Sequence, residues 1–328
     1  MKYTLDSVLF GTFRTLPVVS TVDHYAGHEK LVIKSLETQN LFGGTFDITF
    51  DFEDGASIGQ ESALRHLFKN VIKSELNQHK KLGVRIHDAE SEHFTADLEF
   101  IAKECGDLIA HITVPKIADL KQAKFIIHAI ESEFKINNVA IPPVHFLIET
   151  IQGVRDVFEI AALPYLRGLD FGCMDYVSSF LGAVHSSAMS SPMQFEHPII
   201  VKAKTAIVEA CLANGIIPVH NVCIDYKDPE SAFNDALIAK NNFGFMRMWS
   251  IHPNQIKPIQ EAFTPEKTEV TTSTQILLTG LNANWAPTSF GGKLHDRASY
   301  RYHWSLLKRA KSSGLKLETQ AEILFSSN

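Results

Sequence analysis

Strand-like and helix-like segments alternate along most of this chain, and this alternation limits the possible folds more than any other feature. Short apolar runs are separated by longer segments whose apolar residues recur at helical spacing. Strands joined by helices in this way predict a parallel sheet with right-handed crossovers. The strand-like runs are residues 46–52, 82–86, 108–115, 144–148, 168–171, 216–219 and 244–249.

The number of units distinguishes a closed barrel from an open sheet. About eight β/α units, counting a less clear one before residue 45, favour a (β/α)8 TIM barrel. No GxGxxG motif follows the first strand, so a dinucleotide-binding domain has no local support. We predict an α/β barrel over residues 1–265 and a C-terminal helical extension over 266–328. In the extension, segments 266–281 and 297–311 have helical character, and 282–296 is a loop.

Composition argues against several classes of protein. The net charge is −6 and no long basic run occurs, which argues against nucleic-acid binding. No apolar segment approaches the roughly 20 residues that span a bilayer. The first residues lack the apolar run of a signal peptide, and the four cysteines form no CxxC pair. We therefore expect a cytoplasmic protein with reduced thiols and no membrane partner.

Two carboxylates follow neighbouring strand-like runs. Glu149 comes directly after the run 144–148, and Asp175 follows the run 168–171 after three intervening residues. The C-terminal ends of parallel strands converge on one mouth of a barrel, so these side chains are expected to lie close together. Carboxylate oxygens there suit Mg²⁺. The alternative is that both residues only cap the helices that follow them.

Further charged residues stand at the ends of other strand-like runs. Asp51, Glu53 and Asp54 accompany the first clear run, while Arg85 and Lys116 end the next two. Several carboxylates at one mouth repel one another unless a cation neutralises them. This argues for a divalent ion, with Arg85 as the receptor for a substrate anion. Each residue could also be an ordinary cap or a solvated side chain.

Six motifs occur in an order that resembles a known family. They are FDFEDG, VRIH, VPK, IET, the GxxDY of residues 172–176, and FGFMRMWSIHPNQI. The sequence resembles the citrate lyase β-subunit-like family, part of the HpcH/HpaI aldolase superfamily, which includes malyl-CoA and citramalyl-CoA lyases. The resemblance covers residues 45–265, and IHPNQI with the following FTP is its most characteristic part.

The resemblance implies roles for individual residues. Glu149 and Asp175 match the Mg²⁺ ligands, and Arg85 matches the arginine that binds the carboxylate or oxo group of the substrate. Glu53 and Asp54 match an acidic pair on the substrate side that orders the water shell of the metal.

The resemblance also implies a shared active site. Family members are homotrimers or homohexamers, and in the CoA lyases a C-terminal segment covers the active site of a neighbouring subunit. That segment carries a catalytic Asp in a GKxxD motif, which matches GKLHD at residues 292–296 here. Asp296 is therefore the candidate general acid/base. Its alternative role is to cap the helix that begins at Arg297.

The N-terminal region departs from the family pattern. Residues 13–30 replace the usual first strand and its Lys-containing helix, so that only Arg14 is loosely matched, and Glu61 stands where a Lys is usual. In the family these regions contact CoA.

The leading hypothesis is a Mg²⁺-dependent carbon–carbon lyase. It would cleave or form a malyl-, citramalyl- or citryl-CoA type of 3-hydroxyacyl-CoA, giving an acyl-CoA and a 2-keto acid through an enolate. One alternative is a metal-dependent aldolase that acts on a free hydroxy keto acid without CoA. The other is a non-catalytic subunit that binds a keto acid or an acyl thioester.

Overall fold

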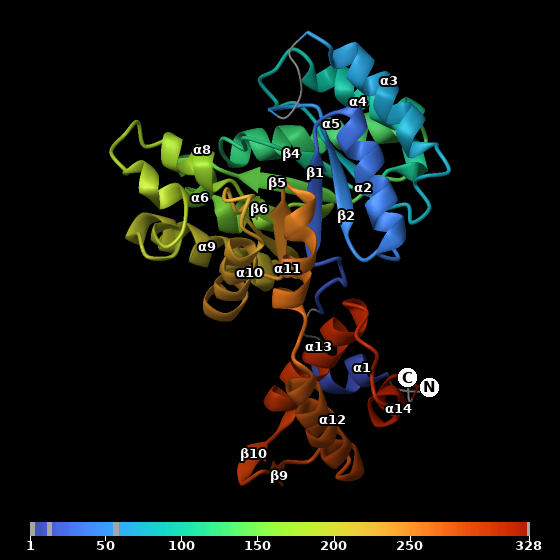
Figure 1. Cartoon of the computed structure of the whole chain (residues 1–328), viewed down its shortest axis with the longest axis vertical. Coiled ribbons are helices and arrows are strands. Elements are labelled where there is room, and N and C mark those ends of the chain that lie inside the picture. The colour runs from blue at the N-terminus through green and yellow to red at the C-terminus, as the bar shows by residue number, and fades with distance from the viewer. Residues whose placement is uncertain (1–3, 12–14, 55–58, 327–328) are drawn as a thin grey trace.

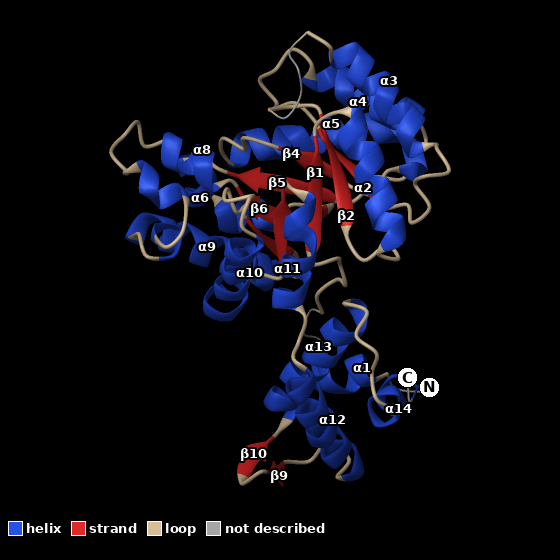
Figure 2. Cartoon of the chain, in the orientation of Figure 1, coloured by secondary structure: helices blue, strands red, loops and turns tan. Residues whose placement is uncertain are grey.

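The protein forms a closed barrel of eight parallel strands, paired in sequential order from β1 to β8. The computed structural model describes residues 4–11, 15–54 and 59–326. Helices surround the barrel (Figures 1 and 2), which confirms the predicted (β/α)8 fold. The strands are β1 (Val22–Ala26), β2 (Asp47–Asp51), β3 (Leu82–Arg85), β4 (Ile112–Val114), β5 (Val144–Ile148), β6 (Leu166–Phe171), β7 (Ile217–His220) and β8 (Arg247–Ser250).

The helices around the barrel include two short ones in residues 151–161. Asp156 ends the first of them and begins the second. The helices are α2 (Glu29–Leu41), α3 (Glu61–Ile72), α4 (Phe94–Glu104), α5 (Leu120–Ile136), α6 (Ile151–Arg155), α7 (Val157–Ala161), α8 (Cys173–Ser178), α9 (Pro198–Asn214), α10 (Pro229–Ile238) and α11 (Pro253–Phe263).

Side chains of each strand alternate between the surrounding helices and the barrel interior. In β2, Ile48 and Phe50 are fully buried in the core between strands and helices. Phe50 packs on Phe68 of α3 with ring centroids 5.7 Å apart. Burying one such ring contributes about 1.5–3 kcal/mol. The intervening residues Thr49 and Asp51 belong to the opposite face of the strand, which faces the interior.

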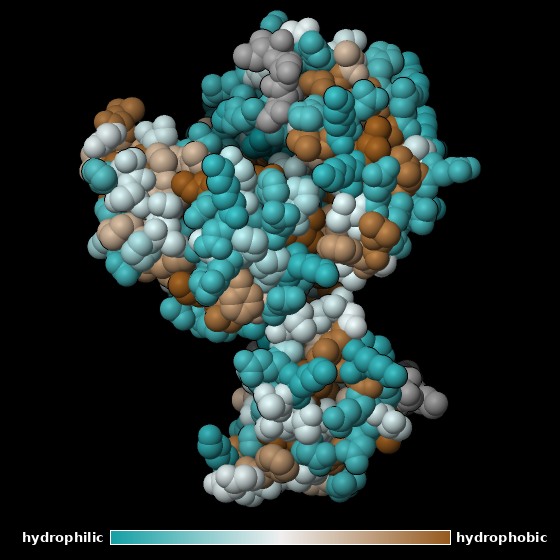
Figure 3. All heavy atoms as spheres, in the orientation of Figure 1, coloured by the Kyte–Doolittle hydropathy of each residue, from teal (hydrophilic) through white to brown (hydrophobic). Residues whose placement is uncertain are grey.

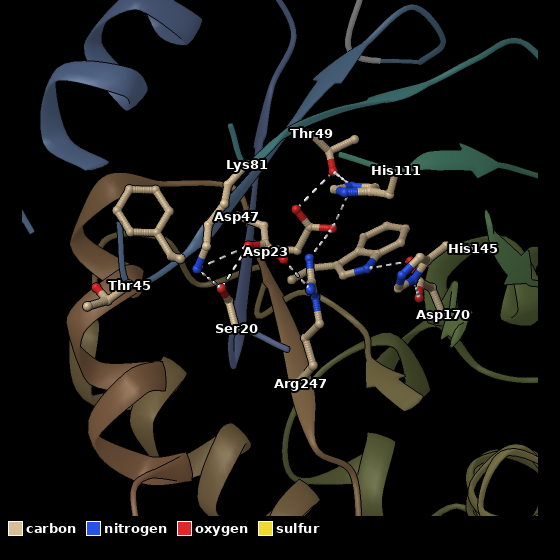
Figure 4. A network of polar contacts seen from close by, with 12 residues as sticks. Ser20, Asp23, Thr45, Asp47, Thr49, Lys81, His111, His145, Asp170 and Arg247 are labelled. Atoms are coloured by element: carbon tan, nitrogen blue, oxygen red, sulfur yellow. Dashed lines mark hydrogen bonds and ion pairs between the residues drawn. The ribbon is translucent and has the colours of Figure 1, made fainter. Parts of the chain in front are cut away.

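The barrel interior holds a buried polar network (Figure 4). Arg247 of β8 forms ion pairs with Asp23 of the adjacent strand β1 and with Asp47 of β2. The Thr49 hydroxyl donates to Asp23 at 2.8 Å and lies 2.7 Å from His111 Nε2. Burial of the Asp23 carboxyl opposes ionisation, but Arg247 and the hydrogen bonds outweigh it and lower its pKa. The paired charges make this interior a rigid polar core rather than a pore.

The C-terminal extension is a separate helical lobe. It contains α12 (Lys267–Asn282), α13 (Arg297–Ser312) and α14 (Thr319–Ser326), and a hairpin of β9 (Thr288–Phe290) and β10 (Lys293–His295) occupies much of the predicted loop. The first helix of the chain, α1 (Leu5–Phe10), joins this lobe, where Leu5 and Leu9 pack in the same hydrophobic cluster as Trp304. The domain boundary after residue 265 stays a prediction.

The lobe and the barrel mouth lie at opposite ends of the molecule. Helix α11 follows β8 and runs back along the barrel, so the chain leaves at the N-terminal ends of the strands. A narrow waist joins the lobe to that end (Figure 3). Among the described helices, none is both long and apolar enough to cross a membrane. The four cysteines are buried and unpaired.

Candidate active site

A cavity of about 400 Å³ opens at the C-terminal ends of the strands. It is lined by five of the residues singled out from the sequence: Asp51, Asp54, Arg85, Glu149 and Asp175. The remaining lining residues include Tyr25, Leu147, Asn221 and Trp249. The strand-end residues of β2, β3, β5 and β6 therefore meet at one mouth, as parallel strands require.

Glu149 is buried at the end of β5, with only 3% of its surface exposed. Its Oε1 accepts a hydrogen bond from the backbone N–H of Lys116 at 2.7 Å. Burial, together with the nearby charge of Asp175, raises its pKa well above the usual range for a carboxyl. Glu149 does not cap helix α6, because Thr150 holds that position and accepts from the Gly153 N–H.

Asp175 lies in the first turn of the short helix α8 and is exposed to solvent. Helix α8 begins after Gly172, and no side chain caps it. Two carboxylates therefore face one cavity, one buried and one exposed, and the charge of Asp175 disfavours ionisation of Glu149. A cation placed between them removes that repulsion.

Arg85 is held by carboxylates on β2 and in the loop after it. Its Nε and Nη2 donate to the two oxygens of Asp51 at 2.7 and 2.6 Å, and Nη1 lies 3.1 Å from Glu53 Oε2. Burial alone would lower the pKa of Arg85, but Asp51 outweighs burial and raises it. A guanidinium carries five N–H donors, so these three contacts leave donor capacity for an anion in the cavity.

Lys116 contacts both the acidic pair, Glu53 and Asp54, and the candidate metal ligand Glu149. Its Nζ pairs with Glu53 and lies 3.2 Å from Asp54 Oδ1, while its backbone N–H holds Glu149. Its φ of +53° is in the left-handed region, which a non-glycine residue occupies only when its surroundings hold it there. One strained residue therefore positions three carboxylates.

Asp296 lies far from the mouth of its own barrel. It is the last residue before α13, and its Oδ1 accepts from the N–H groups of Ala298 at 2.9 Å and Ser299 at 3.3 Å. This is the helix-capping role. Because the lobe leaves the barrel at the opposite end, Asp296 cannot reach the cavity of the same chain (Figure 1). A role in catalysis requires a second subunit and stays a prediction.

The sequence did not single out Tyr25 and Trp249, and it did not reveal Asp51 as the partner of Arg85. Arg14 lies outside the described residues. Within residues 4–11, 15–54 and 59–326, no group of three or more His, Cys, Asp or Glu side chains is arranged as a metal cage. A metal held here would have two carboxylate ligands, with water or substrate completing the shell, as is usual for Mg²⁺.

Comparisons with known proteins identify the relatives of this chain. The profile of the HpcH/HpaI aldolase/citrate lyase family matches residues 37–253. The L-malyl-CoA/beta-methylmalyl-CoA lyase of Cereibacter sphaeroides is 27% identical over 289 residues, covering 80% of this chain and 87% of that protein.

Two solved structures are also similar. The structure of a citrate lyase from Burkholderia xenovorans LB400 has a TM-score of 0.86 and 44% identity, covering 94% of this chain and 97% of that one. The CitE protein of Mycobacterium tuberculosis, in complex with magnesium, acetoacetate and coenzyme A, has a TM-score of 0.68 and 20% identity. The match covers 89% of this chain and 98% of that one, and at this identity it supports the fold alone.

The barrel, its acidic mouth and these relatives define the class of the protein, which is a carbon–carbon lyase. The chain belongs to the HpcH/HpaI aldolase/citrate lyase family.

Proposed function

We propose that the protein is a Mg²⁺-dependent lyase that acts on a 3-hydroxyacyl-CoA of the malyl-, citramalyl- or citryl-CoA type. The products of cleavage are an acyl-CoA and a 2-keto acid. The observation that carries this proposal is the meeting of Glu149, Asp175 and Arg85 on one cavity at the barrel mouth. The CoA-ester substrates named for the Cereibacter lyase support the substrate class.

Glu149 and Asp175 suit the proposed metal. Both are hard oxygen ligands, they face the same cavity, and the charge of Asp175 raises the cost of ionising Glu149 when no cation is present. When bound, Mg²⁺ would supply electrophilic stabilisation of the negative oxygen that develops during carbon–carbon cleavage.

The side chains of the site orient the substrate. Arg85 donates its remaining N–H groups to the carboxylate of the hydroxy acid portion, in a charge-assisted hydrogen bond. Asp51 and Glu53 keep the guanidinium in place, and Lys116 neutralises Glu53 and Asp54. This arrangement leaves Arg85 positive at the position where the keto acid carboxylate binds.

The proposed proton transfer uses Asp296 of a neighbouring subunit. In cleavage, the hydroxyl group passes its proton to solvent and becomes the keto group, while the bond to the thioester α-carbon breaks and its electron pair forms an enolate. Protonated Asp296 then donates its proton to that carbon. In condensation, the Asp296 carboxylate removes the proton from the acyl thioester, the enolate attacks the keto acid, and the resulting alkoxide takes a proton from solvent. The proposal therefore requires a homo-oligomer, and a trimer, a hexamer and a cytoplasmic location stay predictions.

A second candidate is an aldolase that cleaves a free hydroxy keto acid. The atypical segment 13–30 favours it, because CoA binding in the family involves that region. Calorimetric titration with CoA and acetyl-CoA in Mg²⁺ separates the candidates. Binding of either CoA or acetyl-CoA supports the CoA lyase, whereas no detectable binding of either one supports the aldolase.

The direct test is a condensation assay with acetyl-CoA or propionyl-CoA and glyoxylate, pyruvate or oxaloacetate. We expect a 3-hydroxyacyl-CoA product from at least one pair, and loss of activity with EDTA that Mg²⁺ restores. Turnover that persists in EDTA would contradict the metal proposal. If no pair reacts, the lyase proposal is wrong for these substrates.

A further inference from the structure

An aromatic pair forms one wall of the cavity at the barrel mouth. Tyr25 of β1 and Trp249 of β8 come from hydrogen-bonded neighbouring strands. Their rings stack with centroids 4.5 Å apart and an interplanar angle of 29°. Both residues line the cavity that holds Arg85 and Glu149. The wall is therefore flat, apolar and next to the charged groups of the site.

A hydrogen bond to Asp170 fixes the orientation of the Trp249 side chain. Its Nε1 donates to Asp170 Oδ2 at 3.1 Å, and the other oxygen of Asp170 lies 3.0 Å from His145 Nδ1 (Figure 4). An indole has one N–H donor and no acceptor. Trp249 is therefore a rigid support for the Tyr25 ring, and it offers no hydrogen-bond partner to the Tyr25 hydroxyl.

The Tyr25 hydroxyl has no hydrogen-bond partner among the described residues, although it is buried. Arg85 lies over the ring, with its Cζ 5.4 Å from the centroid, but a guanidinium can only donate. A buried hydroxyl without a partner is unfavourable, so water or a ligand is expected to satisfy it. The Tyr25 side chain lines the cavity, but its hydroxyl oxygen is enclosed by neighbouring atoms, so a ligand in the cavity reaches this oxygen only when the side chain turns towards it.

The hydroxyl is a donor at any physiological pH. Burial raises the pKa of Tyr25 well above its usual value, and the carboxylates of Asp23 and Asp170 act in the same direction. The complementary ligand atom is therefore an acceptor oxygen. Next to the positive Arg85, a carboxylate or a polarised carbonyl fits better than a hydroxyl group.

We propose that the Tyr25 hydroxyl donates a hydrogen bond to a carboxylate or carbonyl oxygen of the keto acid, and that the Tyr25–Trp249 face limits the substituent beside it. This inference rests on the proposed lyase function and adds a specificity element to it. Arg85 supplies the charged contact, Tyr25 supplies a neutral contact of defined direction, and the stacked rings supply the steric limit.

The first test replaces only the hydroxyl, in Tyr25→Phe, and titrates glyoxylate and pyruvate into the full-length protein in saturating Mg²⁺. We expect keto acid affinity to fall about tenfold, equivalent to about 1.4 kcal/mol, with the Mg²⁺ affinity and melting temperature unchanged. Tyr165→Phe is the matched control, since its hydroxyl contacts Glu131 on the surface.

The possible outcomes distinguish a failure of the Tyr25 proposal from a failure of the proposed lyase function. Unchanged keto acid affinity in Tyr25→Phe overturns the donor role while leaving the lyase proposal intact. A parallel loss of Mg²⁺ affinity and melting temperature also overturns it, because the residue would then be only structural. Wild-type protein that binds neither keto acid overturns both this inference and the proposed function.

The second test examines the steric limit that the stacked rings impose. It uses Trp249→Phe, which replaces the indole that supports Tyr25 with a smaller ring. A larger cavity should favour pyruvate, with its methyl group, over glyoxylate, and we expect the ratio of their affinities to shift by up to about tenfold. An unchanged ratio in a folded variant overturns the steric part of the proposal.

Discussion

A Cβ atom on Gly172 would lie 2.1 Å from Oε2 of Glu149. The φ of Gly172 is −96°, which any residue can adopt, so the glycine is required for space and not for backbone conformation. The turn after β6 passes directly over the Glu149 carboxylate, and three residues later it presents Asp175. The absence of one side chain thus brings both candidate metal ligands to the same cavity.

Replacing Gly172 with Ala should separate these two carboxylates. The added methyl group must displace Glu149 or the turn, so we expect Mg²⁺ affinity to fall at least about tenfold, with a stability loss of about 1–3 kcal/mol. Isothermal titration with MgCl₂ and urea denaturation measure the two effects.

Gly280→Ala is the control for this prediction. A Cβ there would lie 2.9 Å from the Tyr300 ring in the C-terminal lobe, far from the cavity. It should cost comparable stability and leave Mg²⁺ affinity unchanged. Wild-type Mg²⁺ affinity in folded Gly172→Ala would show that the close approach has no part in metal binding.

Glu149→Gln should retain the stability of the metal-free protein and lose Mg²⁺ binding. A neutral side chain removes the repulsion with Asp175 and still accepts from the Lys116 N–H, so the metal-free variant should melt at or above the wild-type temperature. Ligand binding stabilises only a protein that binds the ligand. Added Mg²⁺ should therefore raise the wild-type melting temperature and leave that of the variant unchanged. An equal rise in both proteins would exclude Glu149 as a ligand.

The ion pair between Arg85 and Asp51 could not be predicted from the sequence. The sequence identified both as strand-end residues. The same reasoning predicted that Arg85, Glu149 and Asp175 lie at one mouth of the barrel. The direct pairing of Arg85 with Asp51 depends on the register of β2 against β3, which sets Asp51 opposite Arg85. Register depends on long-range packing, and the local pattern of either strand does not contain it.

The first strand was expected only as part of a less clear unit before residue 45, and its bounds escaped prediction for a different physical reason. The sequence of β1, VDHYA, contains Asp23 and His24, so it has no continuous apolar run of the kind expected in a buried parallel strand. Asp23 is compatible with the barrel interior because Arg247 and Thr49 pair with it. Those partners are remote in sequence, and the aromatic wall that begins at Tyr25 could not be predicted without them.

The buried amine of Lys204 should make stability depend on pH. Its Nζ donates to Gln194 Oε1 at 2.9 Å and lies 2.8 Å from His220 Nε2, and burial lowers its pKa to about 7. Above pH 7 only the unfolded state keeps this proton, so stability rises with pH towards the unfolded pKa and is lost as pH falls through 7. Each pH unit of this window corresponds to about 1.4 kcal/mol.

Urea denaturation at pH 7 and pH 9 measures this effect. Wild type should gain about 2 kcal/mol over this interval relative to Lys204→Met, which lacks the titrating group. Lys202→Met, at an exposed position on the same helix, should behave as wild type. Identical pH dependence in wild type and Lys204→Met would mean that the amine titrates normally in the fold.

Asp296→Asn should isolate the proposed proton transfer. Asparagine is as good a helix cap as aspartate, so the cap on α13 and the stability should be retained. Loss of a general acid/base should lower turnover about 10²–10⁴-fold while Mg²⁺ affinity stays at the wild-type value. Near-normal turnover would contradict the assigned role of Asp296.

Mixing two inactive variants tests whether the site is shared between subunits. Glu149→Gln chains retain Asp296, and Asp296→Asn chains retain Glu149, so a site built from two chains becomes complete when the barrel comes from one and the lobe from the other. Random co-assembly of equal amounts should restore about one quarter of wild-type activity. Since the lobe leaves each barrel at the end remote from its cavity, we expect this recovery after co-expression and purification of mixed oligomers. Mixed oligomers that are no more active than the separate variants would place the whole site within one chain and exclude Asp296 from it.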